Sequence, residues 1–250
     1  MTLAEHLEEL RRRLGISLAA LLLAVGVSFS QVERIIEWLR HPAADSLPAF
    51  AFFSPTEPIV AYVKVAVLAG VILAMPLILW QLWGFVRAGL RPQERSLGLW
   101  FVWWGSLQFL GGVLAAYYGL LPVSLRFLLG IGRDVLEPVI SIDRYLSFTT
   151  TLMFWSGLIC ELPVVLWLLA RVGIVTSEWL RQQRPYAVLI LVIIAAVVTP
   201  TTDVVSLLLM TLPMALLYEA SILVTRLTRT RPRRAASVSA TRASSATRRP

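Results

Sequence analysis

The stretch IVAYVKVAVLAGVILAMPLILWQL, residues Ile59–Leu82, decides the fold of this chain. Its 24 residues contain one charged side chain, Lys64. They exceed the roughly 20 apolar residues that a helix needs to cross a hydrocarbon core about 30 Å thick. A segment in lipid must satisfy its own backbone hydrogen bonds, so a helix is the expected conformation. The sequence therefore predicts an integral membrane protein.

Five further apolar stretches lie on both sides of this segment. Three of them are long enough to span a bilayer, and the two nearest the C-terminal end are shorter. They run over Leu14–Phe29, Leu97–Leu121, Leu146–Ala170, Tyr186–Val198 and Val204–Ala220. The last two flank a break at Thr199–Asp203, so they form either two short crossings or one re-entrant hairpin. Basic residues on both flanks favour two crossings. We expect an all-α integral membrane protein with six transmembrane helices, the last two of them short.

The composition supports a membrane protein, and the sequence carries no soluble-enzyme signature. Hydrophobic residues make up 57% of the 250 residues and charged residues only 15%, yet the net charge is +8. The mean hydropathy of +0.73 is far above that of a soluble domain with a polar surface. The single cysteine, Cys160, excludes an intrachain disulfide and a multi-cysteine metal site. The motifs HExxH, GxSxG and the P-loop are absent from the sequence, and we expect no catalytic activity, metal or cofactor.

Arginines are distributed unevenly among the segments that separate the apolar stretches. Arginine-rich segments alternate with segments in which arginine is mixed with aspartate and glutamate. The positive-inside bias then places both termini in the cytoplasm. The long loops at residues 31–58 and 122–145 become external, and VERIIEWLRHP (Val32–Pro42) is expected to form a short amphipathic helix on the outer surface.

The chain is expected to divide into a membrane domain, residues 1–225, and a basic cytoplasmic tail, residues 226–250. The tail is poor in apolar residues and rich in Arg, Ser, Ala and Thr, a composition typical of disorder. A basic tail can bind nucleic acid. Beside a membrane, attraction to anionic lipid on the cytoplasmic side explains it better.

Several charged residues lie within or beside the apolar stretches. Glu161 lies deep inside its stretch, where an ionised carboxylate is costly unless it faces a partner, water or a cavity, so we expect an organising role. Pro163 follows two residues later and is expected to kink or loosen the helix. Lys64 lies nearer the outer end of its span, and its ammonium is expected to snorkel to the surface. Near the N-terminus Glu8 is expected to pair with Arg12 and Glu9 with Arg13, since each pair is four residues apart on a helix.

A series of short segments lies in order over roughly residues 1–225. They are HLEELRRRL at His6–Leu14, FFSPTEP at Phe52–Pro58, MPLILWQLWGFVRAGLRPQER at Met75–Arg95, YLSF at Tyr145–Phe148, CELPV at Cys160–Val164, RPY at Arg184–Tyr186 and TPTTD at Thr199–Asp203. Each segment alone is weak evidence for a family. The whole series, together with six spans, is specific evidence. On these segments the chain resembles the TatC family of the twin-arginine (Sec-independent) protein translocase.

The resemblance implies a concave, glove-like arrangement of six helices in the bacterial cytoplasmic (inner) membrane. It implies a non-enzymatic receptor that binds twin-arginine signal peptides and carries no cofactor. Single-span TatA- and TatB-like subunits, membrane lipids and further copies of the receptor are the implied partners, with no nucleic acid. The resemblance also implies that the assembly exports folded proteins with the protonmotive force.

The resemblance also implies which residues form the sites. The signal-peptide site falls on Glu9, Arg11, Arg13, Phe85 and Glu94. The intramembrane carboxylate falls on Glu161, and the partner region at the outer loop falls on Pro200 and Asp203. The sequence departs from the family at Leu207, where a glutamine is common, so this docking contact is less polar here.

Two other functions remain open on the residues alone. A small-molecule transporter would use Glu161 as a proton-coupled site, and it would show paired broken helices around a substrate cavity. An intramembrane enzyme would hold a nucleophile and a base in one aqueous pocket.

Overall fold

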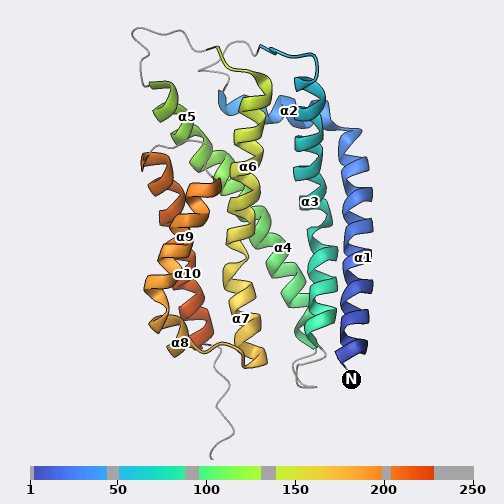
Figure 1. Cartoon of the computed structure of the whole chain (residues 1–250), viewed down its shortest axis with the longest axis vertical. Coiled ribbons are helices and arrows are strands. Elements are labelled where there is room, and N and C mark those ends of the chain that lie inside the picture. The colour runs from blue at the N-terminus through green and yellow to red at the C-terminus, as the bar shows by residue number, and fades with distance from the viewer. Residues whose placement is uncertain (1–2, 44–50, 88–95, 131–138, 199–203, 228–250) are drawn as a thin grey trace, which may run out of the picture.

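The computed structural model describes residues 3–43, 51–87, 96–130, 139–198 and 204–227, and nearly all of them are helical (Figure 1). The helices in chain order are α1 (Leu3–Phe29), α2 (Val32–Arg40), η1 (His41–Ala43), α3 (Glu57–Val86), α4 (Gly98–Ala115), η4 (Ala116–Leu120), α5 (Leu121–Gly130), α6 (Ile142–Cys160), α7 (Leu162–Val172), α8 (Ser177–Gln182), α9 (Arg184–Val198) and α10 (Val204–Leu227). Among these residues the only strand-like pairing is one bridge between Ala51 and Ser141.

Helix α1 lies along α3 at one edge of the molecule (Figure 1). It runs without a break from the acidic and basic N-terminal segment through the first apolar stretch. Helix α3 has 30 residues, about 45 Å at 1.5 Å per residue, and is therefore longer than a bilayer core is thick. Its last turns extend to the level where α1 begins. We call this end of the molecule, where α1 begins and α10 ends, the terminal end.

The opposite end, the α2 end, is covered by the amphipathic helix that the sequence predicts. Helix α2 buries Val32, Ile36 and Leu39. The Tyr145 hydroxyl of α6 donates a hydrogen bond to the Leu39 carbonyl at 2.7 Å, and the Tyr117 hydroxyl donates to the Trp38 carbonyl at 2.6 Å. Both carbonyls lie in the last turn of α2, where regular i+4 partners run out, and the Trp38 carbonyl also accepts from the His41 amide. The two tyrosine hydroxyls tie this turn to η4 and α6 and hold α2 in place.

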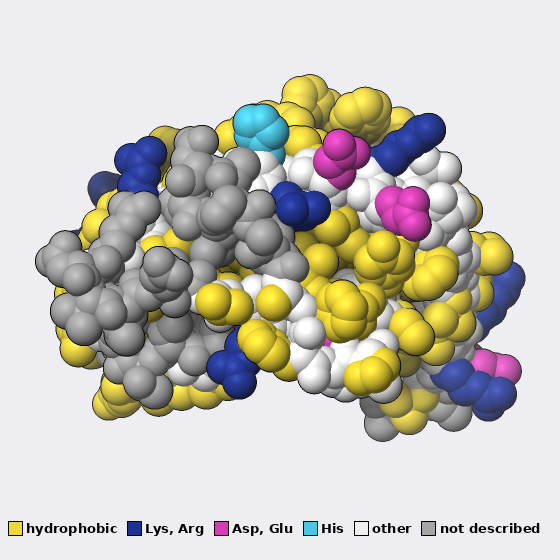
Figure 2. Space-filling model, turned by 90° about the horizontal axis from the view of Figure 1, so that it is seen from above, with side chains coloured by type: hydrophobic (Ala, Val, Ile, Leu, Met, Phe, Trp, Pro, Cys, Tyr) yellow, Lys and Arg dark blue, Asp and Glu magenta, His cyan; other side chains and the backbone are white. Residues whose placement is uncertain are grey.

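Acidic and basic side chains are interspersed with apolar ones on the α2 end (Figure 2). Near this end Glu57, at the start of α3, accepts hydrogen bonds from the Ser141 hydroxyl at 2.6 Å and the Phe53 amide at 3.1 Å. The start of α3 is thereby tied to the start of α6.

Helices α4, η4 and α5 form one continuous stretch with a wide turn at its centre. The five residues of η4 are π-helical, so their backbone hydrogen bonds reach one residue further than in an α-helix. Tyr117 in this turn is buried and stacks on Trp38 with ring centroids 3.9 Å apart. The wide turn thus directs an aromatic ring at α2.

The fourth apolar stretch is broken at Glu161, between the end of α6 and the start of α7. Pro163 lies in the first turn of α7, and its missing N–H explains why the helix does not continue unbroken. The interruption expected from Pro163 is confirmed. Helical hydrogen bonding resumes at once, since the Val165 amide donates to the Glu161 carbonyl at 2.9 Å.

The last two apolar helices differ in length. Helix α9 has 15 residues, about 22 Å, and is as short as the sequence predicts. Helix α10 has 24 residues and ends at Leu227 rather than near Ala220. Two of its hydroxyl groups bond within the helix, as suits an apolar environment: Thr211 Oγ1 donates to the Leu207 carbonyl at 2.8 Å, and Ser221 Oγ donates to the Leu217 carbonyl at 2.6 Å. The length of α10 favours two crossings over the re-entrant hairpin.

Five stretches of the described chain are long and apolar enough to cross a membrane, by length and composition, and α9 adds a shorter one. The described chain starts and finishes at the terminal end, because α10 ends beside α8 and α1 begins beside the end of α3 (Figure 1). A chain that starts and finishes on the same side of a membrane crosses it an even number of times. The all-helical membrane architecture expected from the sequence is confirmed.

Candidate functional site

The first turns of α1 meet the last turns of α3 at the terminal end, and four of the five residues expected at the peptide site lie on these two helices. Arg13 Nη2 donates to Glu9 Oε1 at 2.6 Å, and Arg13 Nε donates to the same oxygen at 3.1 Å. The pairing expected from their spacing is confirmed. The side chains are largely covered, with 19% of Arg13 and 23% of Glu9 exposed.

Arg13 reaches α3 through a gap that Gly84 leaves. Arg13 Nη1 lies 3.5 Å from the Gln81 carbonyl oxygen and 3.5 Å from Gln81 Oε1. A methyl group at Gly84 would collide with the Arg13 guanidinium. The glycine therefore lets Arg13 lie against α3, and Arg13 in turn orients the Glu9 carboxylate.

Sequence reasoning missed both Gln81 and Gly84. The two residues belong to the segment Met75–Arg95 that carries the family resemblance, but nothing in the segment indicates that its glycine accommodates a side chain of another helix. That reason appears only once α1 is packed against α3.

An aromatic pair borders the Glu9–Arg13 pair. The rings of His6 and Phe85 stack with centroids 4.4 Å apart and planes inclined by 27°. Arg11 is exposed on α1. Glu94, the fifth expected residue, lies outside the described residues, in the segment between α3 and α4. The structure thus brings Glu9, Arg13 and Phe85 to one junction.

The junction combines a hydrogen-bond acceptor for a cationic side chain with an apolar surface beside it. Within the described part of the chain, Glu9 Oε2 has no hydrogen-bond partner. A carboxylate can accept two parallel hydrogen bonds from a guanidinium group, a geometry that an ammonium group does not copy. The His6–Phe85 stack provides an apolar face beside this acceptor.

Glu161 is almost completely buried, with 3% of its surface exposed. It faces α4 at Gly105, where an added Cβ would lie 3.2 Å from Glu161 Oε2. Among the described residues, neither carboxylate oxygen has a hydrogen-bond partner, and Ser106 Oγ and Gln108 Oε1 of α4 are buried without one as well. A polar group in an apolar interior costs free energy when it lacks a hydrogen-bond partner. The organising role expected of Glu161 and Pro163 stays a prediction.

Lys64 does more than extend toward the surface. Lys64 Nζ donates to Asp143 Oδ1 at 2.7 Å and to Ser147 Oγ at 2.6 Å, both on α6. The snorkelling expected from the sequence is therefore replaced by an ion pair between α3 and α6. The pair lies toward the α2 end, close to the bonds that Glu57 makes.

The partner region expected at the outer loop is only partly described. Leu207 on α10 is partly buried against the hydrophobic core, and its carbonyl accepts a hydrogen bond from the Thr211 hydroxyl at 2.8 Å. Pro200 and Asp203 lie outside the described residues. Among the residues that are described, no group of three His, Cys, Asp or Glu side chains could hold a metal ion.

Comparison with known proteins gives a single, consistent result. A family model described as Sec-independent protein translocase protein (TatC) matches residues 5–213. The chain belongs to the TatC family. The TatC protein of Carboxydothermus hydrogenoformans is 38% identical over 226 residues, which cover 90% of this chain and 93% of that protein. The TatC protein of Aquifex aeolicus is 38% identical over 231 residues, with 91% of this chain and 95% of that protein covered.

Solved structures agree with the sequence relatives. A crystal structure described as the twin arginine translocase receptor TatC superposes with a TM-score of 0.82 at 37% identity, covering 90% of this chain and all of the other. The resemblance drawn from the sequence segments is confirmed, and so is the helical fold that it implies. As a member of the TatC family, the chain is a protein translocase component, which favours protein transport over the small-molecule transporter and the intramembrane enzyme.

Proposed function

We propose that this chain is the receptor that binds twin-arginine signal peptides at the junction of α1 and α3. The observation that carries the proposal is the Glu9 carboxylate: Arg13 binds one of its oxygens, and the other is a buried acceptor that has no hydrogen-bond partner among the described residues. A twin-arginine motif presents two planar guanidinium groups that stay charged at cellular pH. In this proposal one of them binds Glu9 and the other binds Glu94, while Phe85 contributes an apolar wall.

The remaining residues of the site have supporting roles in the proposal. Arg13 orients Glu9 through their ion pair and is itself held by α3. Arg11, exposed on the same helix, keeps the local charge near balance.

The wider function follows from the family. We propose that the receptor lies in the bacterial cytoplasmic membrane with both termini in the cytoplasm. It recruits single-span TatA- and TatB-like subunits near Leu207, Pro200 and Asp203, associates with further copies of itself, and exports folded proteins with the protonmotive force. The common position of α1's start and α10's end supports this orientation, together with the arginine distribution.

Binding of a labelled signal peptide to the purified full chain tests the site. Each charge-assisted contact should contribute roughly 1–3 kcal/mol, so exchanging both arginines of the peptide for lysines should weaken binding at least tenfold. Glu9→Ala and Glu94→Ala should each lower the affinity strongly. Glu94→Asp should lower the affinity because its reach is shorter, but by less, since the carboxylate remains. Glu8→Ala, an exposed carboxylate one position away, is the matched control and should leave binding unchanged.

The double variant Glu9→Ala with Glu94→Ala decides the assignment. If this protein folds and binds the twin-arginine peptide as tightly as the unaltered chain, the proposed site is wrong. Equal binding of twin-arginine and twin-lysine peptides by the unaltered chain would instead exclude recognition through guanidinium geometry.

A further inference from the structure

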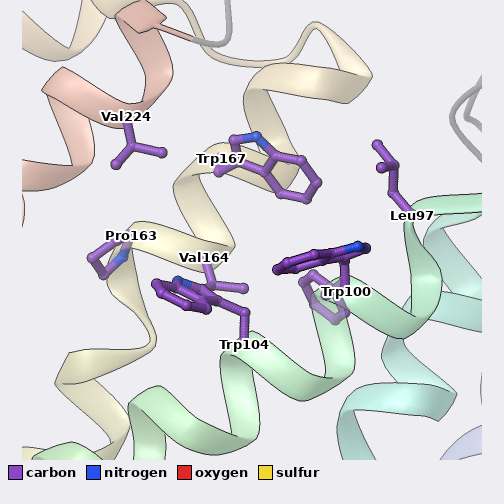
Figure 3. Close-up of a pocket in the computed structure, with 8 residues that line it drawn as sticks. Leu97, Trp100, Trp104, Pro163, Val164, Trp167 and Val224 are labelled. Carbon is purple, nitrogen blue, oxygen red and sulfur yellow. The ribbon is translucent and has the colours of Figure 1, made fainter.

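An apolar pocket of about 310 Å³ opens at the terminal end between α4, α7 and α10. Trp100 and Trp104 project from α4 toward Val164 and Trp167 of α7 (Figure 3). Pro163 of α7 and Val224 of α10 lie on its other side. Trp100 is 70% exposed and Trp104 57% exposed, so the indole rings line the pocket without filling it.

The pocket lies at the level where a membrane interface is expected. It is formed at the start of α4, at Leu97, and near the end of α10, at Val224. Tryptophan is enriched at membrane interfaces because its ring is apolar and its N–H is polar. Three tryptophans around one opening at this level indicate a site in contact with the boundary between headgroups and acyl chains.

A positive charge accompanies the pocket. The Arg171 guanidinium lies 5.3 Å from the centre of the Trp167 ring, in the last turn of α7. The described residues that line the pocket include no acidic side chain. The chain after α10 adds further positive charge, since residues 228–250 contain seven arginines and no aspartate or glutamate.

The apolar lining and the neighbouring charge identify the occupant. The C-terminal segment of this chain is too polar to enter an apolar cavity, and its charge has the same sign as Arg171. A flexible hydrocarbon chain with a negative headgroup matches both the apolar lining and the positive charge of Arg171.

We propose that this pocket binds one acyl chain of an anionic phospholipid, with the lipid phosphate beside Arg171. The indole rings and Val164 contact the acyl chain, and the Arg171 guanidinium donates hydrogen bonds to the phosphate. The site is separate from the α1–α3 junction, and it holds whether or not that junction binds signal peptides.

Native mass spectrometry of the full chain, purified in detergent and freed of lipid, tests the proposal. The protein is titrated with phosphatidylglycerol or with phosphatidylcholine of identical acyl chains. One phosphatidylglycerol should be retained, with about fivefold preference over phosphatidylcholine, because one basic residue near an anionic headgroup is worth about 1 kcal/mol. Equal retention of the two lipids would overturn the proposal.

Two sets of variants locate the site. Arg171→Gln should abolish the preference, and Arg171→Lys should keep most of it because the charge remains. Arg181→Gln, an exposed arginine of α8 at the same end, is the matched control and should behave as the unaltered chain. Equal loss from Arg171→Gln and Arg181→Gln would show general charge attraction and refute a defined site.

The second set, of two variants, tests the cavity itself. Val224→Phe places a ring in the pocket and should lower the retention of both lipids severalfold. Leu223→Phe adds the same ring at a neighbouring position that is 57% exposed and outside the pocket, and it should change nothing. Unchanged lipid retention by Val224→Phe would refute the pocket, as would displacement of the bound lipid by a twin-arginine signal peptide.

Discussion

Replacing Gly84 by alanine should weaken signal-peptide binding while leaving the protein folded. The added methyl group would collide with the Arg13 guanidinium, so the Arg13 side chain must leave α3. The two hydrogen bonds from Arg13 to Gln81 would then break, but both are 3.5 Å long, at the limit of hydrogen bonding, and contribute little. Alanine stabilises a helix by up to about 1 kcal/mol relative to glycine. The free energy of unfolding should therefore change by less than about 1 kcal/mol.

The effect on binding should be larger than the effect on stability. Once Arg13 moves, the Glu9 carboxylate loses the 2.6 Å ion pair that fixes its orientation. We expect the affinity for a twin-arginine peptide to fall about three- to tenfold, or about 0.7–1.4 kcal/mol. Fluorescence anisotropy of a labelled peptide with the purified protein measures the affinity, and thermal unfolding in detergent measures the stability.

A glycine on α1 supplies the control. Gly26 has nothing within 4 Å of the position of an added Cβ, so Gly26→Ala should have no effect on peptide affinity. If Gly84→Ala folds normally and binds the peptide as tightly as the unaltered chain, Arg13 does not position Glu9 for binding.

Three further predictions concern the membrane part of the protein. Glu161→Gln should retain most export of a twin-arginine reporter because an amide still forms hydrogen bonds, whereas Glu161→Leu should lose more; full activity of the leucine variant would contradict a polar role. Lys64→Met should destabilise the protein, and a double-mutant cycle with Asp143→Asn should give a coupling of about 1 kcal/mol in detergent unfolding, as for a partly exposed ion pair. A coupling of zero would show that the pair contributes nothing to the stability of the fold. In a background without the native cysteine, Val139→Cys should react with a membrane-impermeant thiol reagent from outside, and Gln183→Cys should react only from inside; the reverse pattern would invert the proposed orientation.

The helices were predictable because each depends on a local property of the chain. Long apolar runs such as Ile59–Leu82 have one viable conformation in lipid, and Pro163 interrupts its helix through a missing N–H. The amphipathic helix at Val32–Arg40 was equally visible as an alternation of apolar and charged residues. The end of α10 was misjudged because Glu219 and Ser221 interrupt the apolar run, although the helix continues through them to Leu227.

The contacts that build the sites were not predictable in the same way. Lys64 and Asp143 are 79 residues apart, and their pairing depends on how α3 packs against α6. The gap at Gly84 likewise exists only relative to Arg13 on another helix. The roles of Glu9 and Glu161 came from resemblance to a family, because a carboxylate in a sequence does not reveal what it faces.

The π-helical turn η4 gives the third apolar stretch a place where its length can change. This turn contains one residue more than an α-helical turn covering the same rise, so removing one residue from 116–120 would restore an α-helix and leave α5 facing the same way. Elsewhere in α4, a deletion would rotate everything after it by about 100° and turn Leu121 and Leu125 away from the core. Related chains that differ by one residue in this stretch should therefore place the difference at η4, at the local expense of the stacking of Tyr117 on Trp38.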